Sequence, residues 1–298
     1  MSHACAPIGV FDSGLGGLSV LHAIRAQLPH ESIVYLADSG YAPYGEKTDA
    51  FIRARSAALT RWLCAQRAKM LVVACNTATT HAIASLRSTF ALPIVGVEPG
   101  VKPAALASGS GVVGVLATAA TLRSDRLRTL LATHANHCRV VCQAGHGLVE
   151  LIEQGHVAGP EMHALLTRYL EPMAQAGADT VILGSTHYAL LVPTIRTLFG
   201  DRFTLIETGS AIARRVDMLL TEHGLHADDD HAASLRLCST ALDPVPRQAL
   251  ARVATPLAGL SGQATADVEM VDIAMTDADF ERADAIGDLG APTAPLCG

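Results

Sequence analysis

Short apolar runs alternate with longer amphipathic stretches along most of this chain. Eight runs have the length and composition of buried strands: Ile8–Phe11, Ile33–Leu36, Met70–Ala74, Ile94–Val97, Val112–Leu116, Arg139–Cys142, Thr180–Leu183 and Thr204–Ile206. Six stretches between them carry a helical periodicity: Gly17–Gln27, Asp49–Gln66, Ala78–Phe90, Ser124–Thr133, Pro160–Gln175 and Val192–Phe199. Continuous apolar strands that alternate with helices are typical of a parallel sheet covered on both faces. The pattern therefore predicts an α/β fold with doubly wound, mostly parallel sheets.

The predicted elements repeat at a nearly constant offset. Four pairs of positions share this spacing: Gly9 with Gly114, Asp38 with Ala144, Cys75 with Ser185, and Glu98 with Glu207. Regular α/β chains can show such agreement by chance, but four successive strands that agree favour two halves of one ancestral unit. We therefore expect a first α/β domain of residues 1–97 and 208–273 and a similar second domain of residues 98–207.

The segment from residue 274 to residue 298 has a different composition. It is rich in Pro and Gly and poor in aromatic residues. Such chain ends bury too little apolar surface to be held in one place. We expect residues 274–298 to form a flexible tail without a catalytic role.

Two short segments look like one active-site element written twice. Val72–Thr77 and Ile182–His187 each lead from an apolar strand through a small residue to a reactive side chain, and then to hydrogen-bonding side chains. The reactive residue is Cys75 in one copy and Ser185 in the other. Open α/β sheets bind ligands at the carboxyl ends of their strands, so both positions are expected at a binding edge. The sequence thus predicts a site with two similar halves and unequal chemistry.

Composition narrows the classes of function. The chain has 298 residues, is 50% hydrophobic and carries a formal net charge of −6, without a run of Lys or Arg, so nucleic acid is not expected as a partner. No apolar stretch approaches the roughly 20 residues that span a bilayer, and the first residues lack a signal-peptide pattern, so no membrane association is expected. Seven cysteines at irregular spacing favour reduced thiols in a cytoplasmic protein.

Metals and organic cofactors are not expected either. His134, His137 and Cys138 form the one cluster that suggests a metal, but they lie in a polar stretch without a second pair of ligands. The chain has no Walker loop and no motif that identifies a Schiff-base lysine. Any chemistry is therefore expected to use side chains alone.

Five motifs follow one another in a fixed order. They are IGVFDSGLGGLSV (8–20), ADSGYAPYGEK (37–47), ACNTA (74–78), GVEPG (96–100) and LGSTHY (183–188). Each motif is weak alone, but together they resemble the motifs of bacterial glutamate racemases, in the aspartate/glutamate racemase superfamily. The resemblance covers roughly residues 7–273.

This resemblance implies an activity and an architecture. The implied activity is cofactor-independent racemisation of L-glutamate to D-glutamate for peptidoglycan biosynthesis. Two α/β domains related by a pseudo-two-fold axis would enclose the site in their cleft, and a homodimer is possible. In the family, two cysteines face opposite sides of the α-carbon, and the matching positions here are Cys75 and Ser185. The chain thus departs from the family at its second catalytic residue.

Cys75 has a context that suits a reactive thiol. It directly precedes the predicted helix Ala78–Phe90, whose exposed N–H groups and positive dipole end favour a thiolate. The alternative is a buried cysteine at a strand end that only packs. The resemblance favours the catalytic role.

The remaining site residues follow from the resemblance. Asp12 should assist Cys75, and Ser13 should hold substrate, although Asp-Ser-Gly at a strand-to-helix turn is also ordinary N-cap chemistry. A turn at Pro43, Tyr44 and Gly45 should offer backbone N–H groups to a substrate carboxylate. Further candidates for substrate binding are Asn76, Thr77, Thr186 and His187. Glu98 and Glu207 are read as helix-start or interdomain carboxylates and are left out of the site.

Ser185 poses the main chemical question. A serine hydroxyl barely ionises and needs a neighbouring base. If the chain stays extended from Ser185 to His187, both side chains project to one face and could share a hydrogen bond. His187 would then be the direct base, or the site would deprotonate only one enantiomer efficiently. Glu153 resembles a family carboxylate near this position, but Glu150 could point inward instead, and a solvated helix face is equally compatible.

Three hypotheses from different classes remain open. The first is a glutamate racemase, with activity impaired by Ser185. The second is a single-cysteine relative similar to decarboxylases of the superfamily, although those keep the cysteine of the second half. The third is a non-catalytic amino-acid-binding paralogue. The hydrogen-bonding residues that surround Cys75 and Ser185 favour the first hypothesis.

Overall fold

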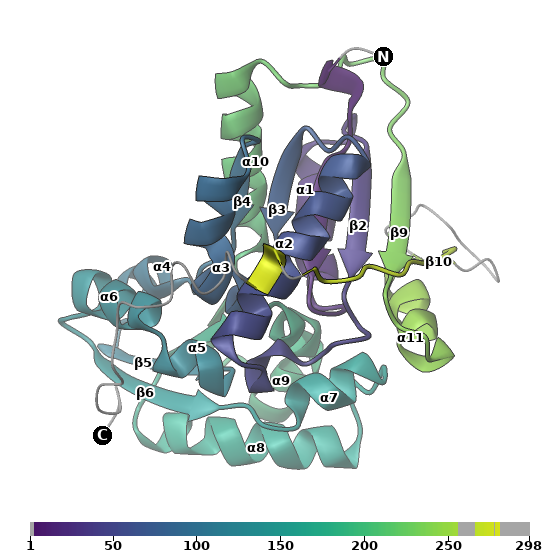
Figure 1. Cartoon of the computed structure of the whole chain (residues 1–298). Coiled ribbons are helices and arrows are strands. Elements are labelled where there is room, and N and C mark those ends of the chain that lie inside the picture. Colours follow the sequence, from purple (N-terminus) through teal and green to yellow (C-terminus); the bar gives the residue numbers. More distant parts are fainter. Residues whose placement is uncertain (1–2, 256–265, 277, 281–298) are drawn as a thin grey trace. The chain divides into compact units, whose positions relative to one another are not determined.

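The computed structural model describes residues 3–255, 266–276 and 278–280, and the chain divides into two compact units (Figure 1). Unit 1 contains the described residues up to Val97 and those from Gly209 onward. The described residues of unit 2 form the continuous segment Glu98–Thr208. The chain therefore leaves unit 1 after β4, builds all of unit 2, and returns to complete unit 1.

Unit 1 is built on a parallel six-stranded sheet with the order β10-β9-β2-β1-β3-β4. The strands are β1 (Ile8–Asp12), β2 (Ile33–Ala37), β3 (Met70–Val73), β4 (Ile94–Gly96), β9 (Leu235–Ser239) and β10 (Glu269–Met270). In the register of the sheet, Gly9 of β1 lies between Val34 of β2 and Leu71 of β3. The central strand β1 is buried along its whole length.

Helices cover the sheet of unit 1. They are α1 (Leu18–Gln27), α2 (Asp49–Ala65), α3 (Asn76–Thr89), α10 (Gly209–His223) and α11 (Pro244–Ala254), with 3-10 turns η1 (His3–Cys5) and η2 (Tyr44–Glu46). Apolar side chains of α2 and α3 share one core cluster with Phe11, Val34 and Leu36. Tyr35 faces the other side of β2, where its hydroxyl donates to the Gly14 carbonyl oxygen in the loop that leads to α1.

Unit 2 has a parallel four-stranded sheet with the order β6-β5-β7-β8. Its strands are β5 (Val112–Ala117), β6 (Arg139–Ala144), β7 (Thr180–Gly184) and β8 (Thr204–Ile206). Its helices are α4 (Val101–Ala107), α5 (Ala119–Arg123), α6 (Asp125–His134), α7 (Leu148–Glu153), α8 (Pro160–Gln175), the 3-10 helix η3 (Thr186–Leu191) and α9 (Val192–Phe199). A Cβ at Gly114 would lie 2.5 Å from Met173 Sδ, so glycine there lets α8 approach β5 closely.

The two sheets repeat one topology. The order β2-β1-β3-β4 in unit 1 corresponds to β6-β5-β7-β8 in unit 2, and all of these strands are parallel. Cys75 follows β3, and Ser185 follows the corresponding strand β7. The α/β fold and the internal repeat predicted from the sequence are therefore confirmed.

The described part of the expected tail differs from the prediction. Asp279 is 1% exposed, pairs with Arg61 of α2 and accepts a hydrogen bond from the Thr276 N–H. This part of the expected tail is therefore held to α2 through Asp279, and residues 277 and 281–298 lie outside the described residues. Cys142 is disulfide-bonded, which also differs from the expectation that every thiol is reduced.

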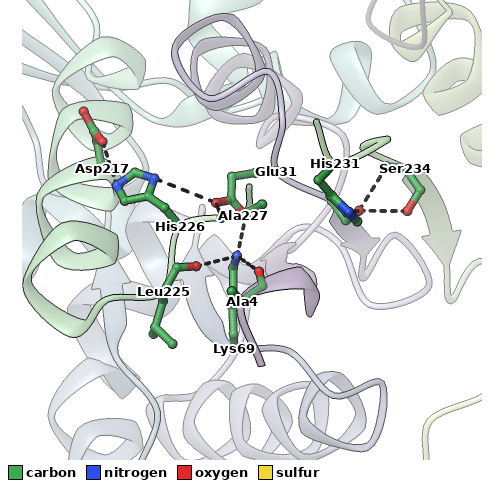
Figure 2. A network of polar contacts seen from close by, with 10 residues as sticks. Ala4, Glu31, Lys69, Asp217, Leu225, His226, Ala227, His231 and Ser234 are labelled. Atoms are coloured by element: carbon green, nitrogen blue, oxygen red, sulfur yellow. Dashed lines mark hydrogen bonds and ion pairs between the residues drawn. The ribbon is translucent and has the colours of Figure 1, made fainter. Parts of the chain in front are cut away.

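A buried ion pair closes the amino-terminal edge of the unit 1 sheet (Figure 2). The Lys69 ammonium lies 2.6 Å from Glu31 Oε2 and also donates to the carbonyl oxygens of Ala4 and Leu225. The Ala227 N–H donates to Glu31 Oε1 over 2.8 Å. The pair thus ties the chain ahead of β1, the loop before β2, the start of β3 and the loop after α10 to one point.

None of the helices in the described part of the chain combines the length and apolar character needed to cross a bilayer.

Candidate functional site

The first half of the candidate site lies at the carboxyl ends of β1 and β3. Asp12 is the last residue of β1, and Cys75 is the N-cap residue of α3. The Cys75 sulfur accepts from the Ala78 N–H at 3.4 Å and lies 3.5 Å from Ser13 Oγ. Asp12, Ser13 and Cys75 are at most 4% exposed. Three residues expected in the site are therefore brought together.

Asp12 also organises the start of α1. Its Oδ2 accepts a hydrogen bond from the N–H of Gly17, the N-cap residue, at 2.7 Å. A Cβ at Gly17 would lie 2.7 Å from the Asp12 Cβ, so glycine is needed for this close approach. The N-cap role considered from the sequence is not what the structure shows, because the N-cap position belongs to Gly17 and no side chain caps α1. The Asp12 carboxylate instead holds the backbone of that residue, and it also acts electrostatically on Cys75.

The protonation state of Cys75 differs from the expectation. Burial and the nearby Asp12 carboxylate raise the pKa of the thiol to about 12, although hydrogen bonds from Ser13 and from the Ala78 N–H act in the opposite direction. The helix N-terminus alone therefore does not produce a thiolate. In the ligand-free protein Cys75 is a thiol at neutral pH.

Two further candidates follow Cys75 on α3. Asn76 and Thr77 are buried in the first turn of the helix. Within the described residues, neither the amide oxygen nor the amide nitrogen of Asn76 has a hydrogen-bond partner. A buried amide without partners is costly, which suits a group that a polar ligand completes.

The loop of Pro43, Tyr44 and Gly45 is anchored to unit 1 by the buried side chain of Tyr44. The Tyr44 side chain is buried, and its hydroxyl donates to Asp38 Oδ2 at 2.6 Å. Burial and Asp38 raise the pKa of Tyr44 well above its ordinary value, so the phenol stays protonated. Asp38 in turn is held by Arg55 and Thr240. No sequence pattern indicated these two partners, because they lie 17 and 202 residues from Asp38 along the chain.

The second half of the candidate site lies at the carboxyl end of β7. Ser185 is 7% exposed and extended, and its side chain makes no capping hydrogen bond to η3. Thr186 and His187 are buried in the first turn of η3. The chain therefore does not stay extended from Ser185 to His187. The prediction that both side chains project to one face and share a hydrogen bond required an extended chain, so it is wrong.

His187 has a carboxylate partner instead. Its Nε2 atom lies 2.6 Å from Glu153 Oε1, and both side chains are largely buried. Of the two candidate carboxylates on α7, Glu153 is thus the one that contacts the site, although it was not among the selected residues. The signal that could have found it was its apolar setting, since α7 buries Leu148, Leu151 and Ile152 around it.

The remaining carboxylates considered from the sequence, Glu98 and Glu207, are more exposed than the buried residues of the candidate site. Glu98 pairs with Arg126 at a half-exposed position, and Glu207 is exposed. Across residues 3–255, 266–276 and 278–280, no three His, Cys, Asp or Glu side chains are grouped as a metal site requires.

Comparison with known proteins identifies the family. Residues 8–216 match the Asp/Glu/hydantoin racemase family. A glutamate racemase from Cupriavidus pinatubonensis is 60% identical over 220 residues, which cover 74% of this chain and 81% of that protein. One from Ralstonia nicotianae is 55% identical over 249 residues, which cover 84% and 89% of the two chains.

Solved structures agree with this assignment. Escherichia coli glutamate racemase, in complex with L-glutamate and the activator UDP-MurNAc-Ala, is 34% identical with a TM-score of 0.79, over 90% of this chain and 99% of that one. Francisella tularensis glutamate racemase, in complex with D-glutamate, is 27% identical with a TM-score of 0.74, over 90% and 98% of the two chains. With its repeated α/β units and its paired strand-end positions, the chain belongs to the glutamate racemases of the Asp/Glu/hydantoin racemase family.

Proposed function

We propose that this chain interconverts L- and D-glutamate by moving a proton at the α-carbon, with Cys75 on one face and the Ser185–His187 side on the other. The supporting observation is that Cys75 and Ser185 follow corresponding strands of two repeated units in a member of the glutamate racemase family. The relatives bound to L-glutamate and to D-glutamate support the choice of substrate. The D-glutamate would serve peptidoglycan biosynthesis.

Substrate binding is assigned to short polar groups. Backbone N–H groups of Tyr44 and Gly45 would hold a carboxylate, and the unpartnered amide of Asn76 would complete its hydrogen bonds on the ligand. Ser13, Thr77 and Thr186 would contact the remaining polar atoms.

Cys75 would be activated by the substrate itself. Its pKa of about 12 keeps the free thiol protonated, and burial and Asp12 are the causes. The α-ammonium of glutamate would bring a positive charge near the sulfur, which favours the thiolate. The Ala78 N–H and the Ser13 hydroxyl would then stabilise the developing negative charge.

The opposite face needs a different base. A serine hydroxyl does not ionise near neutral pH, whereas an imidazole exchanges protons readily there. His187, oriented by Glu153, would accept or return the proton on this face. This unequal pair predicts that one direction of proton removal is slower than the other.

The test is incubation with L- or D-glutamate in deuterated water. Optical rotation and α-deuterium incorporation are followed separately, because inversion needs both faces whereas exchange needs only one. Racemisation of both enantiomers supports the proposal. Exchange of one enantiomer without inversion would mean that Ser185 disables one face. Binding without any exchange would favour an amino-acid-binding paralogue and contradict the proposed activity. A cytoplasmic location and a homodimer stay predictions.

A further inference from the structure

A buried polar network lies directly behind the loop of Pro43, Tyr44 and Gly45. We propose that Arg55 is a positioning residue for this loop: through Asp38 it fixes Tyr44, and hence the backbone N–H groups that hold a glutamate carboxylate. The inference rests on the proposed function, and it adds a residue that contacts neither the substrate nor the reacting atoms.

Arg55 binds Asp38 through a bidentate contact. Its Nε donates to Asp38 Oδ2 at 2.9 Å, and its terminal nitrogen donates to Oδ1 at 2.6 Å. Both side chains are fully buried, so water does not screen the pair. A guanidinium fork fixes the plane of a carboxylate, which a single point charge cannot do. The Asp38 oxygen that receives Nε also receives the Tyr44 hydroxyl.

Two distant segments hold the same pair. The Thr240 hydroxyl, just beyond β9, donates to Asp38 Oδ1 at 2.8 Å and accepts from the Gly40 N–H at 3.2 Å. Arg55 also donates to the Ile273 carbonyl oxygen. The loop's anchor is therefore assembled from α2, the end of β2, the end of β9 and the segment after β10.

One side of this buried network borders a cavity. A cavity of about 620 Å³ borders Arg55, Tyr41, Thr240 and Ile273, and the Arg55 guanidinium carbon lies 4.1 Å from the centre of the Tyr41 ring. Side chains next to such space can move without overpacking a core. Removal of the fork is therefore expected to loosen Tyr44 and its loop more than it disturbs the sheet.

Arg61 offers a matched control on the same helix. It also connects α2 to the C-terminal segment, by its ion pair with Asp279, but it does not contact Asp38. Variants at Arg55 and Arg61 each remove a link between α2 and the C-terminal segment, and only the Arg55 link reaches the loop. The Arg61 side chain is 36% exposed whereas Arg55 is fully buried, so Arg61→Met controls for the loss of the link and not for the loss of a buried charge. Thr240→Val is a milder change that removes a single donor from Asp38.

The experiment measures kcat and KM in both directions for Arg55→Met, Arg55→Lys, Thr240→Val and Arg61→Met. For Arg55→Met we expect KM for both enantiomers to rise about tenfold, a loss of ~1.4 kcal/mol of binding, with kcat within about threefold of the parent. Arg55→Lys and Thr240→Val should give smaller rises, and Arg61→Met none. Tyr44→Phe combined with Arg55→Met should be less than additive, because both act through Asp38.

Equal KM values in the Arg55 and Arg61 variants would overturn the inference, as would a loss confined to kcat. If Arg55→Met does not fold, the KM values of Thr240→Val and Arg61→Met are compared instead. A rise in Thr240→Val alone supports the inference, and equal values overturn it. If the parent protein binds glutamate without racemising it, the proposed activity fails alone, and calorimetric dissociation constants of the same variants replace KM. A parent that binds no glutamate would refute both.

Discussion

The two reactive positions differ most in the acidity of their side chains. Cys75 carries a thiol that burial and Asp12 keep protonated, yet a nearby cation can ionise it. Ser185 carries a hydroxyl that no ordinary environment ionises at neutral pH, so in the proposed reaction its face would depend on His187, which Glu153 contacts. The asymmetry between the half-sites is therefore chemical, while their backbone setting after β3 and β7 is similar.

Substituting each of the two reactive residues by the other type, in separate variants, tests this asymmetry. Ser185→Cys should raise the rate of racemisation by about tenfold or more, a gain typical of adding a competent acid–base group. Cys75→Ser should abolish α-deuterium exchange from its own face, because the hydroxyl that replaces the thiol barely ionises at neutral pH. Both are measured by polarimetry and by α-proton exchange. A fully active parent whose rate is unchanged by Ser185→Cys would show that the second base is misplaced.

Asp12 and Ser13 should have opposite effects on the Cys75 thiol. Asp12→Asn removes a negative charge that raises the Cys75 pKa, while its amide oxygen can still accept from Gly17. Alkylation of Cys75 by iodoacetamide at pH 9 should then be about three- to tenfold faster, since each pKa unit changes the thiolate fraction about tenfold. Racemisation should nevertheless fall.

Ser13→Ala removes a hydrogen bond that lowers the same pKa, so alkylation should become slower. Peptide mapping separates Cys75 from the partly exposed thiols Cys64 and Cys138. Identical alkylation rates in the two variants would contradict the electrostatic explanation.

Some residues of the site could be predicted and others could not. Cys75 and Ser185 were accessible because each follows an apolar strand and the two segments repeat. The pairing of His187 with Glu153 was not, because it joins η3 to α7 across 34 residues and depends on the 3-10 turn that begins at Thr186. Arg55 looked like any arginine on a helix, since its partners come from other parts of unit 1.

At the scale of elements, the eight apolar strands and six long helices are where the pattern predicts them, within a few residues. The helices α4, α5, α7, α10 and α11 were not among the predicted stretches. Shortness explains the first three, because five to seven residues span at most two turns and show little periodicity. It does not explain α10 and α11, which have 15 and 11 residues. Strand β9 was missed because Arg236 interrupts its apolar run.

The Lys69–Glu31 pair makes the amino-terminal edge of the unit 1 sheet sensitive to single substitutions. Lys69→Met leaves the Glu31 carboxylate buried without its cation, and this should lower the free energy of unfolding of unit 1 by about 3–5 kcal/mol. Urea denaturation measures the change. Restoring neutrality with Glu31→Gln in the same chain should recover part of it.

Arg196→Met is the control for Lys69→Met. Its pair with Asp201 is exposed, and its loss should cost less than about 1 kcal/mol. Equal losses in the two variants would mean that burial does not govern the contribution of the Lys69 pair.

At the scale of the whole molecule, the repeat was the most informative signal. The repeat predicted two units, with boundaries near residues 97 and 207. In the structure the chain passes from unit 1 to unit 2 after Val97 and returns to unit 1 after Thr208. The strands β9 and β10 have no counterpart in unit 2, so no repeat could reveal them. They extend the unit 1 sheet beyond β2.

The discontinuous course of unit 1 has a consequence for protein synthesis. As the chain emerges from the ribosome, Glu98–Thr208 is complete while Asp38 and Arg55 still await Thr240 and Ile273. Domains generally fold as units during translation, so the inserted unit can acquire its structure first. A nascent chain that has exposed Thr208 but not yet Thr240 would hold a finished half with Ser185 and an unfinished half with Cys75. Competence to turn over an amino acid would thus arise only after the inserted unit has already formed.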